Sequence, residues 1–254
     1  LLEKTAGKIT ELEEKVKNLD ISGSLGIAHT RWATHGKPTT LNAHPHSDCK
    51  GQIMLIHNGI IENYQILKKS LEADGHVFKT ETDTEVLAHL IEEFYTGERL
   101  EDAVQKALKV VEGTYGVIVI SALEPGKMVA ARNGSPVVVG VGENETFIAS
   151  DVAAILQHTR QVIYLEDQQM VVATPKNFTT MTIRNEKVEH IVQEVEWDLE
   201  MIEKGGFEHF MLKEIFEQPE TIRNAMRGRL IEDTARAKLG GLHMTDDQLR
   251  AVNR

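Results

Sequence analysis

The chain has 254 residues, which is enough for one large hydrophobic core or two smaller ones. Its formal net charge of −11 argues against a general nucleic-acid-binding protein, because contacts with phosphates need clustered Lys and Arg side chains. No apolar run has the length of a membrane span or a signal-peptide core, and the single cysteine, Cys49, excludes an intrachain disulfide, so we expect a cytoplasmic protein without a membrane partner.

The first 60 residues combine one amphipathic segment with two short apolar runs. Apolar positions on one helical face predict a helix over residues 8–19. The runs at residues 27–28 and 53–56 are typical of buried strands, and polar residues follow each of them. Loops that a rigid scaffold holds in place commonly carry chemistry, so these polar residues are the first candidates for a functional site.

The pair Asn58-Gly59, directly after the second run, has two interpretations. Asn-Gly is most often the turn of a β-hairpin. An Asn side-chain amide and a following Gly N–H can also point at one spot and form an oxyanion hole. Residues 60–64 do not alternate as a returning strand would, which counts against the hairpin. Arg31 offers a planar fork that matches a carboxylate, although an ordinary ion pair explains it equally well.

The middle of the chain is predicted to be helical. Thr82 and Glu85 have the spacing of a capping box at the start of a helix that continues to Phe94. Asp83 then lies in the first turn, where the helix dipole favours an acidic residue. The apolar pattern also predicts two further helices, over residues 62–73 and 100–111, and one short strand over residues 77–79.

From residue 116 the pattern changes to short β-branched runs separated by Gly, Pro and Asn. The predicted strands are residues 117–120, 128–131, 137–140, 147–149, 161–165, 170–173, 179–183 and 188–192. Residues 184–187 would join the last two strands as a hairpin. Helices grouped against mostly antiparallel strands indicate a layered α+β fold.

The end of the chain differs from this strand-rich part. A helix is predicted over residues 207–229 with a kink or a new start at Pro219, then a turn at residues 239–242 and another helix from residue 245. We therefore expect a first domain over residues 1–204. Residues 205–254 would form a helical linker toward a further domain.

Four strings, residues 29–36, 42–46, 57–63 and 81–85, occur in an order and spacing that resemble the class II glutamine amidotransferase domain. Three further strings extend the likeness to most of the chain, at residues 132–136, 149–151 and 210–219. Within this family the resemblance is greatest to the members that make glucosamine-6-phosphate from fructose-6-phosphate.

The resemblance implies a fold of the N-terminal-nucleophile hydrolase type, a four-layer αββα sandwich of two antiparallel sheets between helical layers. It implies hydrolysis of glutamine to glutamate and ammonia without a cofactor or a metal. In the family the ammonia passes to a sugar-phosphate isomerase domain, where fructose-6-phosphate accepts it. A homo-oligomer is expected for the full enzyme.

The resemblance also implies how glutamine would be held. By position, Arg31 matches the residue that binds the α-carboxylate of glutamine, with help from Thr34 and His35. Asp83 matches the partner of the α-ammonium group. One cation and one anion are what is needed to orient an amino acid.

Four more residues take roles from the same resemblance. Asn58 and Gly59 match the two oxyanion-hole donors. Trp32 matches the family residue that acts as a mobile gate between the glutaminase site and the sugar-phosphate site. His44 lies in a shared motif and is assigned to the glutamine site with a less direct role.

The sequence departs from the family at the nucleophile. In the family, the first residue of the mature chain is a cysteine whose own α-amine acts as the base. Here the first residue is Leu1, and Cys49 has no free α-amine and lies outside the family motifs. We therefore expect residues before Leu1 in the native protein, and no thiol chemistry from the sequence as it stands.

Three alternatives remain open at this stage. One is a different amidotransferase of the same class, and another is a glutamine-binding regulatory module without turnover. The third is a metal hydrolase that uses histidines, which is disfavoured because no acidic ligand accompanies them. Its candidate ligands are His35, His44, His46 and His57.

Overall fold

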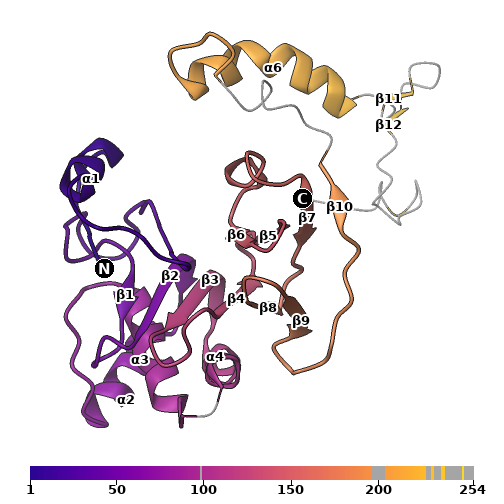
Figure 1. Ribbon diagram of the computed structural model, residues 1–254. Helices are drawn as coiled ribbons and strands as arrows, with labels where there is room; N and C mark the ends of the chain where they lie inside the picture. Colours follow the sequence, from indigo (N-terminus) through magenta and orange to yellow (C-terminus); the bar gives the residue numbers. More distant parts are fainter. Residues whose placement is uncertain (98, 196–203, 227–229, 232–235, 238–247, 249–254) are drawn as a thin grey trace. The chain divides into compact units, whose positions relative to one another are not determined.

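The computed structural model describes residues 1–97, 99–195, 204–226, 230–231, 236–237 and 248 (Figure 1). The chain divides into two compact units, Leu1–Glu196 and Trp197–Arg254. Our assignment of residues 205–254 as a linker stays a prediction. No helix among the described residues is both long and apolar enough to span a membrane.

The first unit is built on a six-stranded antiparallel sheet. Its two longest strands pair along their whole length, from Ile53 opposite Ser121 to Ile61 opposite Gly113. The strands in spatial order are β1 (His46–Ser47), β2 (Ile53–Ile61), β3 (Gly113–Ser121), β4 (Met128–Asn133), β8 (Gln169–Ala173) and β9 (Phe178–Thr182).

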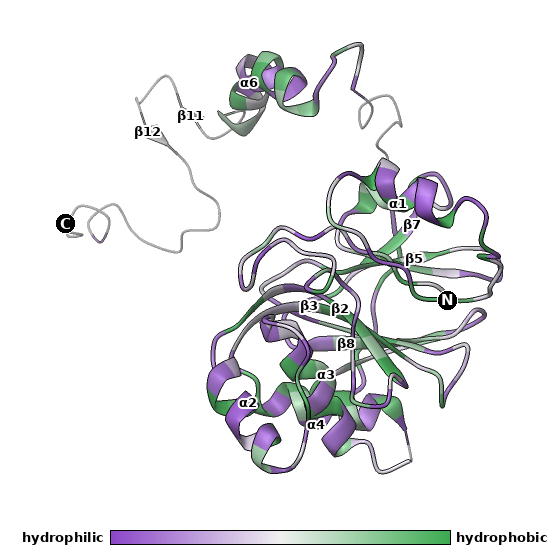
Figure 2. Ribbon diagram, turned by 90° about the vertical axis from the view of Figure 1, so that its left-hand side faces the viewer, coloured by the Kyte–Doolittle hydropathy of each residue, from purple (hydrophilic) through white to green (hydrophobic). Residues whose placement is uncertain are grey.

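Three helices lie on one face of this sheet, as Figures 1 and 2 show. They are α2 (Tyr64–Ala73), α3 (Asp83–Phe94) and α4 (Leu100–Val110). Side chains of β2 and β3, such as Leu55 and Val117, are fully buried against helix residues such as Leu87 and Val104. Burial of each such side chain contributes about 1.5–3 kcal/mol, which fixes α3 on the sheet.

A second, four-stranded antiparallel sheet packs on the opposite face. Ala130 and Val171 of the first sheet form a separate cluster with Val139 and Ile163 of the second. Successive side chains of a strand point to opposite faces of the sheet. One strand of the first sheet therefore contributes residues both to the core under the helices and to the core between the two sheets. The second sheet has the order β10 (Gln193–Glu194), β7 (Gln161–Tyr164), β5 (Val138–Val141) and β6 (Thr146–Ala149).

The outer face of the second sheet is covered by the short 3-10 helix η1 (Val152–Ala154) and the residues after it. Ile155 lies so close to β5 that its methyl group would be 2.4 Å from a Cβ at position 140. Helices, six strands, four strands and this segment make four layers, so the predicted α+β sandwich is confirmed.

Three predicted strands are wrong. Residues 27–28 and 77–79 have no strand pairing, and residues 188–192 pair only at their start, where the Val188 N–H donates to the Thr180 carbonyl. The chain then leaves β9 and supplies β10 to the other sheet. A short apolar run becomes a strand only where a neighbour offers its backbone groups, which local composition does not report.

Two helices lie outside the layers just described. α1 (Ile9–Val16) falls within its predicted range and buries none of its residues. In the second unit, α6 (Phe210–Met226) continues through Pro219, which the sequence predicted to be a kink or a new start. The same unit contains β11 (Leu230–Ile231) paired with β12 (Arg236–Ala237). The turn predicted at 239–242 and the helix predicted from 245 lie outside the described residues.

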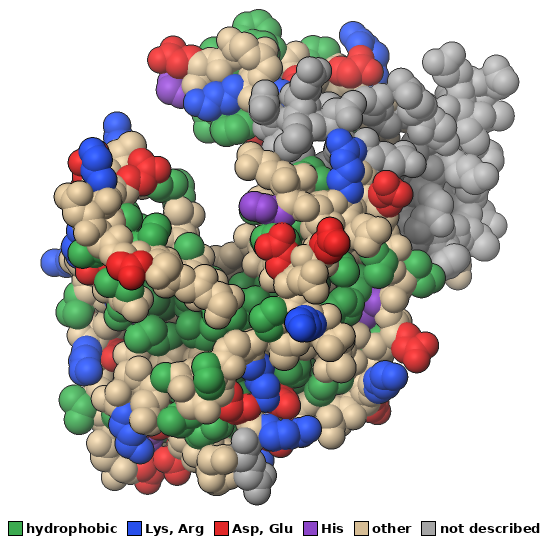
Figure 3. Space-filling view, in the orientation of Figure 1, with side chains coloured by type: hydrophobic (Ala, Val, Ile, Leu, Met, Phe, Trp, Pro, Cys, Tyr) green, Lys and Arg blue, Asp and Glu red, His purple; other side chains and the backbone are tan. Residues whose placement is uncertain are grey.

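On the face drawn in Figure 3, charged side chains of both signs are present. Lys and Arg are interspersed there with Asp and Glu and with apolar side chains. Oppositely charged side chains also form ion pairs, such as Arg99 with Asp102 and Lys127 with Glu101.

Candidate active site

Asn58 and Gly59 lie within a strand. They belong to β2 and pair with Gly116 and Tyr115 of β3, so the hairpin-turn interpretation is wrong. Gly59 has φ +133°, and a Cβ at this position would lie 2.1 Å from the Thr114 carbonyl oxygen. Only glycine fits here, because both the dihedral angle and the close approach of β3 exclude a side chain. This close approach fixes the backbone next to the Asn58 side chain.

The Asn58 side chain is oriented by His29. The Nε2 atom of His29 donates to the Asn58 Oδ1 atom at 2.7 Å, since an amide oxygen can only accept. Burial lowers the pKa of His29, which favours the neutral ring. The Asn58 amide group therefore keeps its two N–H donors, which have no partner among the described residues, for another acceptor.

Behind His29 lies a cluster of buried histidines. The His44 ring stacks on His29 with centroids 4.1 Å apart, and its Nδ1 accepts the His57 backbone N–H at 3.2 Å. His57 is held between the Thr84 hydroxyl and the Thr114 carbonyl. Burial is the main cause that lowers the pKa of both His44 and His57; at His57 it outweighs the Asp83 carboxylate and the hydrogen bond with Thr114, which act to raise the pKa. These rings are neutral parts of the wall.

The same contacts argue against the metal-hydrolase alternative. Nδ1 of His44 accepts a backbone N–H, Nε2 of His46 faces the Thr82 hydroxyl, and both ring nitrogens of His57 face a threonine hydroxyl or a carbonyl. Among the described residues, these histidines do not form a group whose ligand atoms converge. A metal ion would need those lone pairs free and directed at one point.

Asp83 supplies a buried negative charge. It is the first residue of α3, and its carboxylate oxygen Oδ2 accepts the Ile61 backbone N–H at 2.8 Å. Its other oxygen, Oδ1, lies 4.0 Å from the Nδ1 atom of His35, which has no hydrogen-bond partner. Asp83 is therefore fixed through one oxygen and keeps the other for a cationic ligand.

The loop after residue 29 provides the opposite charge. The terminal nitrogens of Arg31 donate to the backbone carbonyls of His35, Gly36 and Lys37, which curl the loop around the guanidinium group. Asn42 connects this loop to the residues just before α3. Its side-chain NH2 group donates to the Lys37 carbonyl and to the Glu81 carboxylate, and its amide oxygen accepts the Glu81 backbone N–H. This arrangement positions Arg31 beside the end of β2.

A cavity of about 340 Å³ brings most of these residues together. Seven of the eight site residues predicted from the sequence line it, and His35 alone does not; the seven are Arg31, Trp32, Thr34, His44, Asn58, Gly59 and Asp83. Trp32 has 91 % of its surface exposed, so it borders the cavity mainly from the solvent side.

Sequence reasoning missed the supporting residues. No role was predicted for His29 or Thr114, and His57 was considered only as a metal ligand, although all three line the cavity. His29 stands two residues before Arg31 and His57 next to Asn58, so their positions in the same strings were the available signal. The contact of His29 with Asn58 joins residues 29 positions apart, and that of His57 with Thr114 joins residues 57 positions apart. Motif spacing does not predict contacts over such separations.

Comparison with known proteins agrees with this geometry. The family described as "Glutamine amidotransferase domain" matches residues 29–157. The glutamine–fructose-6-phosphate aminotransferase of Chlorobaculum tepidum is 51% identical over 99% of this chain and 42% of its own length. The enzyme of that name from Thermus thermophilus is 52% identical over 93% of this chain and 39% of its own. The chain spans about two fifths of the curated relatives it matches.

A solved structure supports the same relationship. Glutamine phosphoribosylpyrophosphate amidotransferase from B. subtilis superposes with a TM-score of 0.50 and 28% identity, covering 61% of this chain and 34% of the other. The family match spans half of the chain and includes every predicted site residue, from Arg31 to Asp83. The chain therefore belongs to the glutamine amidotransferase domain family.

Proposed function

We propose that this chain is the glutaminase part of a glutamine–fructose-6-phosphate aminotransferase. It would hydrolyse glutamine to glutamate and ammonia, and the ammonia would convert fructose-6-phosphate into glucosamine-6-phosphate on a further domain. Relatives that are about half identical over nearly the whole chain carry this name. The observation that carries the proposal is one cavity bordered by a buried carboxylate with a free oxygen and by an oriented amide with free donors.

The two charged groups match the two ends of an amino acid. Oδ1 of Asp83 would accept from the α-ammonium group, and Arg31 with Thr34 and His35 would bind the α-carboxylate. Asp83 is 3 % exposed, so its interaction with an ammonium group is weakly screened by water. Charges fixed in this way orient the substrate before reaction, which is a large part of catalysis by proximity.

Asn58 and Gly59 would stabilise the tetrahedral intermediate. The oxygen of the glutamine side-chain amide becomes negative when a nucleophile adds, and two fixed N–H donors stabilise that charge. His29 makes this possible because it binds the amide oxygen and leaves the NH2 group of Asn58 for the substrate. His44 would act through His29, on which it stacks.

The nucleophile of this family is a thiol, and Cys49 does not fit that role. Cys49 does not line the cavity around Asn58; it contacts His76 and His89 instead. Trp32, exposed at the rim, would gate the passage of ammonia. A homo-oligomeric enzyme in the cytoplasm, with a sugar-phosphate isomerase domain as the partner of this part, completes the proposal.

The experiment compares two nitrogen donors in the purified full-length protein. We expect Asn58→Ala to lower kcat with glutamine by about 10²–10³-fold, the usual loss when one oxyanion-hole donor is removed. Formation of glucosamine-6-phosphate from fructose-6-phosphate and added ammonia should be unchanged, because that step does not use the cavity.

The matched control is Asn177→Ala, which alters an exposed asparagine in the turn before β9. It should leave both activities intact. Equal losses with glutamine and ammonia in Asn58→Ala would contradict the assigned role of Asn58. Glutamine binding without turnover in the unaltered protein would favour the regulatory-module alternative, and turnover with a different acceptor would favour another amidotransferase of the class.

A further inference from the structure

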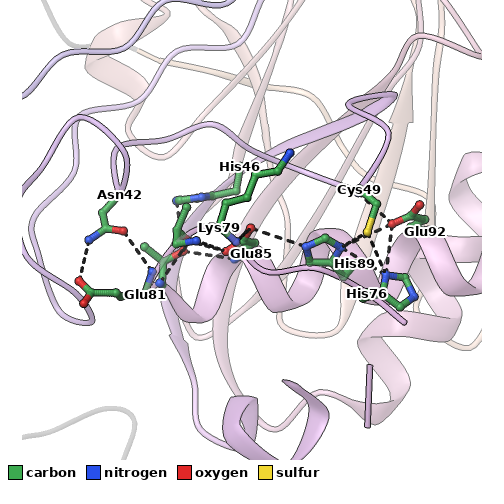
Figure 4. Close-up of polar contacts among 11 residues, drawn as sticks. Asn42, His46, Cys49, His76, Lys79, Glu81, Glu85, His89 and Glu92 are labelled. Atoms are coloured by element: carbon green, nitrogen blue, oxygen red, sulfur yellow. Dashed lines mark hydrogen bonds and ion pairs between the residues drawn. The ribbon is translucent and has the colours of Figure 1, made fainter. Parts of the chain in front are cut away.

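A second cluster of reactive side chains lies away from the glutamine cavity (Figure 4). Cys49 of the β1–β2 loop, His76 of the α2–α3 loop, and His89 and Glu92 of α3 place four potential ligand atoms within 4.8 Å of one another. None of the four residues lines the cavity that holds Asn58. No sequence motif joins these four residues; the only local signal is that His89 and Glu92 lie three residues apart on one face of a helix.

Both histidines present the same nitrogen to the cluster. Their Nδ1 atoms lie 3.3 Å apart, and each is 3.3–3.4 Å from Oε2 of Glu92. Sγ of Cys49 is 3.6 Å from His76 and 3.4 Å from His89. Two nitrogens, a carboxylate oxygen and a sulfur thus converge on one point, and such electron-rich atoms repel one another unless a proton or a cation lies between them.

The far side of each ring faces a second carboxylate. Nε2 of His76 is 3.2 Å from Oε2 of Glu93, and Nε2 of His89 is 3.6 Å from Oε1 of Glu85. A carboxylate at Nε2 favours the proton on that nitrogen and leaves the Nδ1 lone pair directed into the cluster. Metal-binding histidines commonly have this second partner, which fixes the tautomer and strengthens the ligand.

The spacing of the four atoms matches a small tetrahedral ion. With zinc bond lengths of about 2.0–2.1 Å to nitrogen and oxygen and about 2.3 Å to sulfur, the edges are about 3.3 Å between nitrogen or oxygen atoms and about 3.6 Å to sulfur. Five of the six edges, 3.3, 3.3, 3.4, 3.4 and 3.6 Å, follow these values, and the sixth, from Sγ of Cys49 to the Glu92 carboxylate, lies within 4.8 Å. We propose that Cys49, His76, His89 and Glu92 bind one divalent ion of the zinc type.

Such a site would be structural. Four protein ligands complete a tetrahedron and leave no open position, which distinguishes structural from catalytic zinc. The ion would join the loop after β1 and the loop after α2 to α3, the helix that begins with Asp83. Glu85 connects the two regions, because it faces His89 and also accepts the backbone N–H groups of Lys79 and Thr80.

The test measures metal content and cobalt spectra in the full-length protein purified without a histidine tag. After removal of metal with a chelator and dialysis against zinc, we expect one more zinc per chain in the unaltered protein than in Cys49→Ser. Titration with cobalt(II) should give intense visible bands and a sulfur-to-cobalt charge-transfer band, and Cys49→Ser should lose both. These readouts do not depend on glutaminase activity.

Further variants distinguish a four-ligand site from weak binding by the thiol. His76→Asn and Glu92→Gln should each reduce the zinc content as Cys49→Ser does, whereas His209→Asn, which alters an exposed histidine, should retain it. Cys49 and Glu92 are partly accessible, so these changes test binding in a folded protein, checked by circular dichroism. Equal zinc in all proteins, or no bound zinc in any, would overturn the proposal and leave a hydrogen-bonded cluster.

Discussion

At the scale of single residues, the orientation of the Asn58 amide depends on His29. An amide has an accepting and a donating side, and a neutral histidine whose Nε2 carries the proton selects the accepting side at 2.7 Å. The donating side is then left for the cavity. Asp83 is oriented in a similar way. The Ile61 N–H donates to one carboxylate oxygen, and the other oxygen is left for a ligand in the cavity.

Asp83→Asn tests the second of these arrangements. The amide oxygen of asparagine can still accept the Ile61 N–H, so the helix start should stay in place while the charge is lost. A hydrogen bond to a charged group contributes about 1.5–3 kcal/mol, so kcat/KM for glutamine should fall about ten- to hundredfold. Steady-state kinetics with glutamine and with ammonia would measure the effect.

The matched variant is Asp74→Asn, which alters an exposed acid at the end of α2. It should not change the kinetics with either donor. If Asp83→Asn reduced the reaction with ammonia as much as the reaction with glutamine, Asp83 would not be the partner of the α-ammonium group.

At the scale of elements, the start of α3 is held by a network that differs from the predicted capping box. The Thr82 hydroxyl accepts the Glu85 N–H at 3.3 Å, as predicted. The Glu85 carboxylate reaches instead to the N–H groups of Lys79 and Thr80. Burial raises the pKa of Glu85, but the interaction with the nearby His89 ring and hydrogen bonds from Lys79 and Thr80 outweigh it and lower the pKa to about 2.

Gly59→Ala tests how tightly β2 and β3 approach at the site. The new Cβ would lie 2.1 Å from the Thr114 carbonyl oxygen, and the residue would keep φ +133°. Overpacking against backbone and dihedral strain each cost about 1–3 kcal/mol, so the free energy of unfolding should fall by about 2 kcal/mol or more. Urea unfolding of the full-length protein would measure it.

Gly51→Ala serves as the control in the loop before β2. Gly51 also has a positive φ, +68°, but a Cβ there meets nothing within 4 Å. It should cost only about 1 kcal/mol, from the dihedral angle alone. Equal losses in the two variants would show that the contact with Thr114 adds nothing.

At the scale of the whole molecule, the buried histidines make stability depend on pH. Burial lowers the pKa of His29, His44, His46 and His57, in the case of His46 to about 3. In the unfolded chain these rings bind protons with a pKa of about 6.5, so below that pH the unfolded state binds more protons than the folded state. Their contribution is complete above about pH 6.5 and is lost as the pH falls.

We therefore expect the free energy of unfolding to decrease between about pH 7 and about pH 5, by on the order of 1 kcal/mol per pH unit for each ring that stays neutral. Urea titrations across this range would measure the slope. Glu85 does not contribute in this window, because its lowered pKa stabilises the fold above about pH 4.5 and the loss begins only below that. His46→Asn should reduce the slope, and a stability independent of pH would contradict the assignment of neutral buried rings.

The sequence by itself determined where most helices and strands lie and most of the residues that line the cavity around Asn58. Periodicity placed α2, α3 and α4 and most strands of both sheets, because the two faces of each element meet different surroundings. It failed at residues 27–28, 77–79 and 188–192, where a strand needs a partner that only the fold supplies.

Tertiary structure decided the contacts between segments far apart in the chain. It placed Asn58-Gly59 within a strand, set His29 against Asn58, and joined Cys49 to His76 and His89 across 27 and 40 residues. Local pattern reports which face of an element is buried, since burial repeats with the element's own period. It does not report which side chains from different elements come into contact, because loops and packing determine how far apart those elements lie.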